Sequence, residues 1–207
     1  ITCRDWSSDV CSSDLESSEG RIDPKISYQR AMRKMEKGDY DGAIKDFDEA
    51  IRLDNNFCDA YNYRGIVKSW KGDNNGAIDD YNQAIKLDPK YNKAYHNRAI
   101  SYKDKKEFDK ALEDYDKSIE LSKNSLYYYN RGTLFYQKND FDKAIKDFEE
   151  AIKLNSQYCD AYVEIGIYYS QKNDFDKALD FFTKAVIINP ENRSEEHTSE
   201  LQSRQVI

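Results

Sequence analysis

Histidine and cysteine are scarce in this sequence, which has two His and four Cys among 207 residues. One His and two Cys fall within residues 1–15 and 193–207, whose composition differs from that of the interior. Three candidate soft metal ligands remain between these ends, far apart in the sequence: Cys58, His96 and Cys159. A structural zinc site takes four Cys or His ligands, and an activated nucleophile needs its His nearby in space. The sequence therefore predicts no catalytic residue, no metal site and no cofactor, and we expect no enzyme activity.

Long apolar runs and a basic surplus are also missing. No apolar run between residues 16 and 192 approaches the ~20 residues that a membrane helix needs. Lys and Arg number 32 against 39 Asp and Glu, for a net charge of −7; the two ends carry −2 and −1, so the interior carries −4. Proteins that bind phosphate backbones present a basic face. We therefore expect no membrane contact within the interior and no nucleic-acid partner.

The two ends are related to each other at the level of DNA. One DNA encoding of residues 193–207, read as its reverse complement in a shifted frame, encodes residues 1–15 in full. These codons resemble a widely used sequencing-library adapter. We therefore interpret 1–15 and 193–207 as adapter-derived, expect 1–15 to be disordered and 16–23 to be a linker, and exclude the ends from functional reasoning. On this interpretation the interior is a fragment of a longer reading frame.

The interior repeats with a period of 34 residues. Alanines that follow a turn-like segment recur at spacings of 34, 34, 33 and 34 residues: Ala43, Ala77, Ala111, Ala144 and Ala178. This register divides the domain 24–192 into five rows: 24–57, 58–91, 92–124, 125–158 and 159–192. A fixed period of this length indicates a stack of identical supersecondary units.

Each row is predicted to form two helices joined by a tight turn. A small residue stands at the eighth position, where the crossing helix comes close: Ala31, Gly65, Ala99, Gly132 and Gly166. The first helix ends at Gly or Asn, which tolerate the left-handed conformation, except in the third row, where Lys106 stands there. An acid suited to cap the second helix follows, and that helix carries a single apolar stripe.

The segment AYNYRGIVKSWKGDNNGAIDDYNQAIKLDP resembles the tetratricopeptide repeat. The hallmark small and aromatic positions of that family are filled by Tyr61, Gly65, Ala77, Tyr81, Ala84 and Pro89. The resemblance covers the whole of 24–192 and implies an all-α solenoid, a right-handed superhelix of five antiparallel helix pairs. It departs from the family pattern at Ser27, Lys34, Ser118 and Lys123. Pentatricopeptide and Sel1-like repeats fit the spacing and residue pattern less well.

The resemblance also implies a peptide-binding groove lined by the first helix of each row. The matching positions are Tyr28, Met32, Asn62, Ile66, Lys93, His96, Ile100, Tyr129, Thr133, Tyr136, Val163 and Ile167. Their apolar members would hold an extended peptide, Asn62 and His96 would bond its main chain, and Lys93 would meet a carbonyl or carboxylate. The alternative for each residue is simple packing or exposure. The chaperone-tail clamp of one subclass is matched only by Lys93 or, one row later, by Asn97, so we predict no binding of such tails.

Two recurring charged patterns have simpler interpretations. The runs KDFDEA, IDDYNQ and KDFEEA pair acids as a glycosidase or metal site would, but they recur at one repeat position. We interpret them as a solvated outer face of the second helix. Arg64, Arg98 and Arg131 also recur, and we expect structural ion pairs or stacking on Tyr rings rather than phosphate binding.

The apolar end of the fifth row raises the question of self-association. Five of its residues cannot all face inward: Phe181, Phe182, Val186, Ile187 and Ile188. Since a solenoid needs a polar cap, we expect the natural protein to continue and this fragment to self-associate or fray there. We expect a non-catalytic scaffold for a protein or peptide partner; the alternatives are a regulatory module of a larger enzyme or signalling protein, and an RNA-binding helical repeat.

Overall fold

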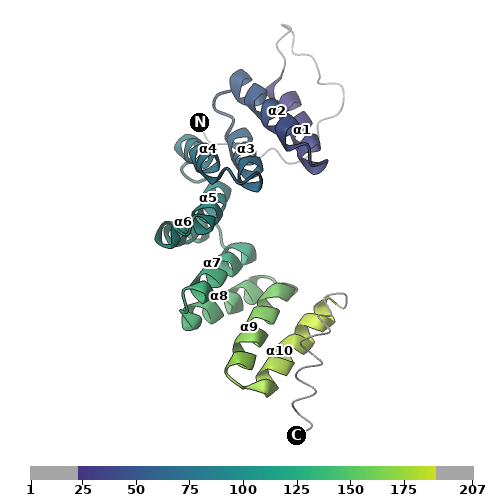
Figure 1. The fold of residues 1–207 in the computed structure, drawn as a ribbon, viewed down its shortest axis with the longest axis vertical. Helices are drawn as coiled ribbons and strands as arrows, with labels where there is room; N and C mark the ends of the chain where they lie inside the picture. Colours follow the sequence, from purple (N-terminus) through teal and green to yellow (C-terminus); the bar gives the residue numbers. More distant parts are fainter. Residues whose placement is uncertain (1–22, 190–207) are drawn as a thin grey trace. The chain divides into compact units, whose positions relative to one another are not determined.

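The computed structural model describes residues 23–189, which form ten α-helices and no strand (Figure 1). The chain divides into two compact units, residues 1–121 and 122–207. The ends interpreted as adapter-derived lie outside the described residues, as do 16–22 of the expected linker and 190–192 of the fifth row. The expected all-α solenoid of helix-pair repeats is confirmed.

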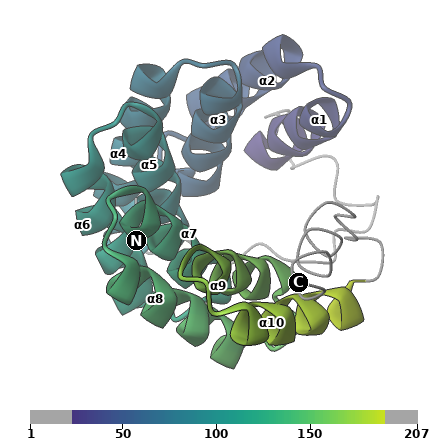
Figure 2. The same ribbon diagram turned by 60° about the horizontal axis from the view of Figure 1, so that its bottom comes forward.

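The first unit contains three helix pairs. Their helices are α1 Pro24–Glu36, α2 Tyr40–Leu53, α3 Cys58–Trp70, α4 Asn74–Leu87, α5 Asn92–Asp104 and α6 Phe108–Leu121. Within each pair the two helices pack along each other, and α2 contacts α3 as α4 contacts α5. In this unit α1, α3 and α5 form one layer and α2, α4 and α6 the other (Figure 2).

The second unit contains two helix pairs. Its helices are α7 Ser125–Gln137, α8 Phe141–Leu154, α9 Cys159–Gln171 and α10 Phe175–Ile188. The pairs are α7 with α8 and α9 with α10, and α8 also contacts α9. Both units thus use the same two-helix building block.

The turns inside the pairs follow the expected chemistry. Gly38 and Gly72 have φ of 76° and 84°, and Asn139 and Asn173 have φ of 60°. Lys106 adopts φ 61°, so the third pair makes the same left-handed turn although its residue is ill suited to it. Asp39 and Asp73 each cap the second helix by accepting from the backbone N–H of the residue three positions on.

The core of each pair is a small residue facing an aromatic ring. A Cβ placed on Gly132 would lie 2.8 Å from Phe148 Cε1, and one on Gly166 would lie 2.6 Å from Phe182 Cε1. The equivalent rings of the first three pairs, Phe47, Tyr81 and Tyr115, are fully buried as well. The close approach of the two helices therefore depends on the small residue at the eighth position of each row.

Candidate peptide-binding site

A bidentate ion pair joins the two helices of most pairs. Arg64 donates to Asp80 at 2.9 and 2.5 Å, Arg98 to Asp114 at 2.7 and 2.6 Å, and Arg131 to Asp147 at 2.8 and 2.7 Å. In the first pair Arg30 and Lys34 lie 2.7 and 2.8 Å from Asp46. The expectation that the arginines are structural is confirmed.

The same arginines also stack on tyrosine rings of their own helix. The guanidinium carbons of Arg64, Arg98 and Arg131 lie 5.4, 5.5 and 5.6 Å from the ring centroids of three tyrosines: Tyr61, Tyr95 and Tyr128. A cation over an aromatic face at this distance is attracted by the ring. Each guanidinium is therefore held from two sides.

The interpretation of the acidic runs as a wholly solvated face was wrong for one acid of each run. Asp46, Asp80 and Asp147 are 6, 3 and 4% exposed, because each turns inward to meet the basic residue of the first helix. A buried carboxylate is tolerated only when it is paired and hydrogen-bonded. The neighbouring acids of the runs, such as Asp48, Asp79 and Glu149, are exposed as expected.

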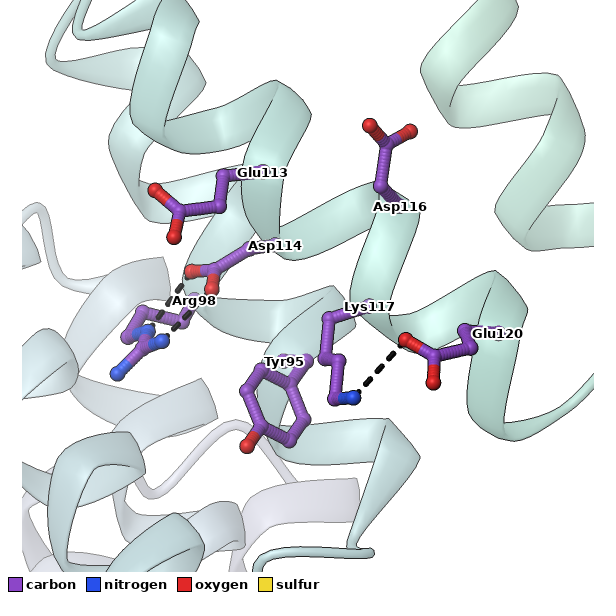
Figure 3. Close-up of a pocket in the computed structure, with 7 residues that line it drawn as sticks. All are labelled: Tyr95, Arg98, Glu113, Asp114, Asp116, Lys117 and Glu120. Carbon is purple, nitrogen blue, oxygen red and sulfur yellow. Dashed lines mark hydrogen bonds and ion pairs between the residues drawn. The ribbon is translucent and has the colours of Figure 1, made fainter.

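One hollow of about 380 Å³ lies against α5 and α6, lined by residues drawn in Figure 3. Its charges are largely satisfied within the hollow, since Arg98 donates to Asp114 and Lys117 Nζ lies 2.9 Å from Glu120. None of the predicted groove residues lines it. We therefore treat it as an ionic surface of the third pair.

Two predicted groove residues of the first unit are buried. Asn62 is 1% exposed, and its side-chain oxygen accepts a hydrogen bond from the Asn97 amide at 2.9 Å. His96 is 5% exposed with its ring 5.8 Å from that of Tyr115, and burial lowers the pKa of His96 to about 4. A neutral imidazole is therefore expected near pH 7. Both polar groups are already engaged inside the unit.

The remaining predicted residues of the first unit are more accessible. Tyr28 is half-buried, with ring centroids 5.0 Å from Phe57 and 5.9 Å from Tyr63, and Met32 packs against the same cluster. Burial, followed by the nearby charge of Asp59, raises the pKa of Tyr28. Ile66 and Ile100 are half-buried, whereas Lys93 is exposed.

The five predicted residues of the second unit are all half-buried: Tyr129, Thr133, Tyr136, Val163 and Ile167. The Tyr129 ring lies 5.1 Å from that of Tyr158 and 5.7 Å from that of Phe148. The Tyr136 hydroxyl donates to the Gln171 side chain at 2.6 Å. Val163 and Ile167 pack against the cluster of Ala178 and Phe182.

Two carboxylates on α9 were not among the predicted site residues. Glu164 accepts a hydrogen bond from the Tyr129 hydroxyl, and Asp160 lies close enough to influence both groups. Burial, followed by the Asp160 charge, raises the pKa of Glu164, while the Tyr129 bond lowers it. The sequence offered one signal, since the segment CDAYVEIGIYYSQ has two acids four residues apart and no basic residue.

Metal sites, membrane spans and the apolar end can be described only for residues 23–189. In this range no group of three His, Cys, Asp or Glu side chains is placed to hold a metal ion. None of its helices is long and apolar enough to cross a membrane. At the end of α10, Phe182 is 7% exposed and Ile187 is 73% exposed. Self-association through this end stays a prediction.

The sequence matches two family models, and the fold is similar to several solved structures. The tetratricopeptide repeat model matches residues 93–125, 125–158 and 159–192, and a second TPR repeat model matches 33–68 and 71–106. No curated protein sequence matches.

Among solved structures, one of MamA has a TM-score of 0.68 at 26% identity over 82% of this chain and 96% of its own. YrrB, described as a TPR protein with an unusual peptide-binding site, has a TM-score of 0.64 at 21% identity, over 86% of this chain and 92% of its own. PilF of Pseudomonas aeruginosa has a TM-score of 0.75 at 16% identity, over 82% of this chain and 78% of its own.

Proposed function

This chain belongs to the tetratricopeptide repeat family, and on that premise we propose that it is a non-catalytic scaffold that binds a peptide segment of a protein partner. The binding surface would be the side of the first helices that carries the predicted groove residues. The observation that carries the proposal is the family match across five repeats. Repeat proteins of this kind bind through the surface that their stacked helices share.

The chemistry of the predicted residues supports a peptide ligand. Tyr28, Tyr129 and Tyr136 supply rings, while Met32, Ile66, Ile100 and Ile167 supply apolar contacts, all on first helices and only partly buried. Aromatic and apolar side chains supply most of the binding energy in such surfaces, and a few polar groups fix orientation. Lys93 is exposed and would meet a carbonyl or carboxylate of the ligand.

The test begins with selection of binders from a random peptide library displayed on phage, using the full chain as target. The selected peptide is then titrated into isotopically labelled protein, and amide shifts are mapped by NMR. We expect the largest shifts on α1, α3 and α5 or on α7 and α9. Shifts confined to the second helices, or no selected peptide at all, would overturn the proposal.

A pair of threonine variants sharpens the mapping in the second unit. Thr133 lies on α7 among the predicted residues and its hydroxyl only donates to the Asn130 carbonyl at 2.8 Å, whereas Thr183 is exposed on α10. For a peptide that maps to this unit, Thr133→Arg should weaken binding at least tenfold by filling the surface. Thr183→Arg adds the same side chain on a second helix and should leave the affinity within twofold.

A further inference from the structure

The first helices of the second unit carry an unusual charge pattern. Helix α9 has no Lys or Arg and two acids, Asp160 and Glu164, at positions i and i+4, hence on one helix face. Val163 and Ile167 continue that face at i+3 and i+7. From α7, Tyr129 bonds to Glu164 and Tyr136 bonds to Gln171. We call these six residues the α7–α9 face: Tyr129, Tyr136, Asp160, Val163, Glu164 and Ile167.

The two carboxylates are not neutralised by the rest of the described chain. Neither forms an ion pair with any of residues 23–189. The one basic residue of α7, Arg131, is bound at 2.7 and 2.8 Å by Asp147 of α8. By contrast, the four buried acids of the helix pairs, Asp46, Asp80, Asp114 and Asp147, each have a basic partner on the facing helix.

The equivalent position of the first unit shows how such an acid is satisfied when it is purely structural. The sequence Cys-Asp-Ala-Tyr opens both α3 and α9, so that Asp59 corresponds to Asp160. Asp59 accepts a hydrogen bond from the Tyr91 hydroxyl, and the counterpart of Glu164 is the uncharged Tyr63. The second unit therefore has an additional carboxylate at a position where the first unit has a phenol.

We propose that the α7–α9 face binds a Lys or Arg side chain of the partner peptide, held by Asp160 and Glu164 beside the Tyr129 ring. The charge of the face selects a cation, and an aromatic ring beside a carboxylate suits a guanidinium or ammonium group. Val163 and Ile167 offer an apolar surface for the aliphatic stem of such a side chain. This inference rests on the proposed function and specifies its ligand as a basic segment.

Helix α8 provides a matched control for removal of the two charges. Asp142 lies in the first turn of α8 as Asp160 does in α9, and Glu149 is a mid-helix acid as Glu164 is. Both control residues are exposed on a second helix. The test pair is therefore D160N/E164Q against D142N/E149Q in the full chain, and circular dichroism melting establishes that both variants are folded.

The experiment uses the random-peptide selection, repeated on the three proteins. Peptides selected on the parent chain should be enriched in Lys and Arg relative to the input library. The enrichment should disappear with D160N/E164Q and persist with D142N/E149Q. Bound peptides that map to the first helices without basic enrichment would overturn this inference and leave the scaffold proposal standing. Failure to select any peptide would overturn both.

A double-mutant cycle then locates the contact. The best basic peptide, labelled with fluorescein, is compared by anisotropy with versions in which each Lys or Arg in turn is replaced by Gln. We expect D160N/E164Q to weaken binding of the basic peptide at least tenfold. One of the Gln peptides should bind the parent chain at least tenfold more weakly than the basic peptide does. On the D160N/E164Q variant, the same Gln replacement should weaken binding little further. Additive losses, or equal losses in D142N/E149Q, would overturn the direct contact and indicate only a general charge effect.

Discussion

The fourth and fifth helix pairs have the same backbone arrangement but differ in the side-chain contacts between their two helices. Their turns have the same left-handed Asn, and a Cβ added to either glycine would lie only 2.8 or 2.6 Å from the Phe ring that it faces. In the fourth pair Arg131 and Asp147 form an ion pair beside that contact. In the fifth pair the same two positions are Ile165 and Phe181, and the Phe181 ring stacks on Tyr169 at 5.8 Å.

This difference separates what the helix pair requires from what it tolerates. The contact of a small residue with an aromatic ring occurs in both pairs, so the close helix approach depends on it. The buried ion pair is replaceable by apolar side chains of similar size, as expected when the desolvation of two charges offsets most of their attraction. We expect the ion pair to matter more for how one helix aligns on the other than for net stability.

The largest effect should come from removal of the shared aromatic ring. Phe148 is fully buried and packs with both its own pair and Ala161 and Ile165 of the next. Phe148→Ala should lower the free energy of unfolding by about 3–5 kcal/mol through lost burial and the cavity left behind. Phe182 is 7% exposed with fewer described neighbours, so Phe182→Ala should cost less. Urea unfolding checks the order, and a larger loss for Phe182→Ala would contradict it.

Removal of one charge should have the next largest effect, and only in the fourth pair. Asp147→Ala would leave the guanidinium of Arg131, whose side chain is 19% exposed, without its bidentate partner. We expect a loss of about 2–3 kcal/mol, below the usual cost of breaking a fully buried pair because water reaches part of this Arg. Hydrogen exchange should show faster opening of α7 and α8. Asp147→Asn, which retains an acceptor, should lose less.

The 34-residue period predicted the helix pairs because the residues that recur are those that pack the two helices together or begin a helix. Small and aromatic residues recur where the two helices of a pair meet, and an Asp recurs directly before the second helix, at Asp39, Asp73, Asp140 and Asp174. The turn at Lys106 shows that the repeat period predicts the turn correctly even where one residue suits it poorly. The inward acids were missed because a single-helix pattern does not say which exposed-looking acid faces a partner helix. The recurrence of Arg sixteen residues before Asp80 and Asp114 was the available signal.

The candidate site was less predictable because it depends on contacts between rows. Asn62 is buried, and its side chain accepts a hydrogen bond from Asn97 in the following pair. Position within a repeat does not reveal such neighbours. Asp160 occupies the second position of its row, as Lys93 does in the third row, whereas Glu164 lies outside the positions that the family resemblance marked. Both stand out only once the basic partners of the four buried acids are known.

Exchange of the two interfaces should have a smaller effect than loss of one charge. Arg131→Ile together with Asp147→Phe converts the fourth pair to the arrangement of the fifth. We expect a change of no more than about 1 kcal/mol in either direction, because both charges leave together. A double-mutant cycle should give a coupling energy of roughly 1–2 kcal/mol between the two positions. If the double variant is as unstable as Asp147→Ala, the ion pair is essential and the comparison fails.

The smallest effect, and an equal one in the two pairs, should come from the shared turn. Asn139 and Asn173 both have φ 60°, where an Asn side chain is tolerated better than Ala. Asn139→Ala and Asn173→Ala should each lower the free energy of unfolding by about 1 kcal/mol, and the matching Gly variants should not lower it. Equal losses measured by urea unfolding would show that the turns are equivalent and that the two pairs differ only in their interfaces. Unequal losses would mean that the interface difference extends to the turn, since the backbone angle is the same in both.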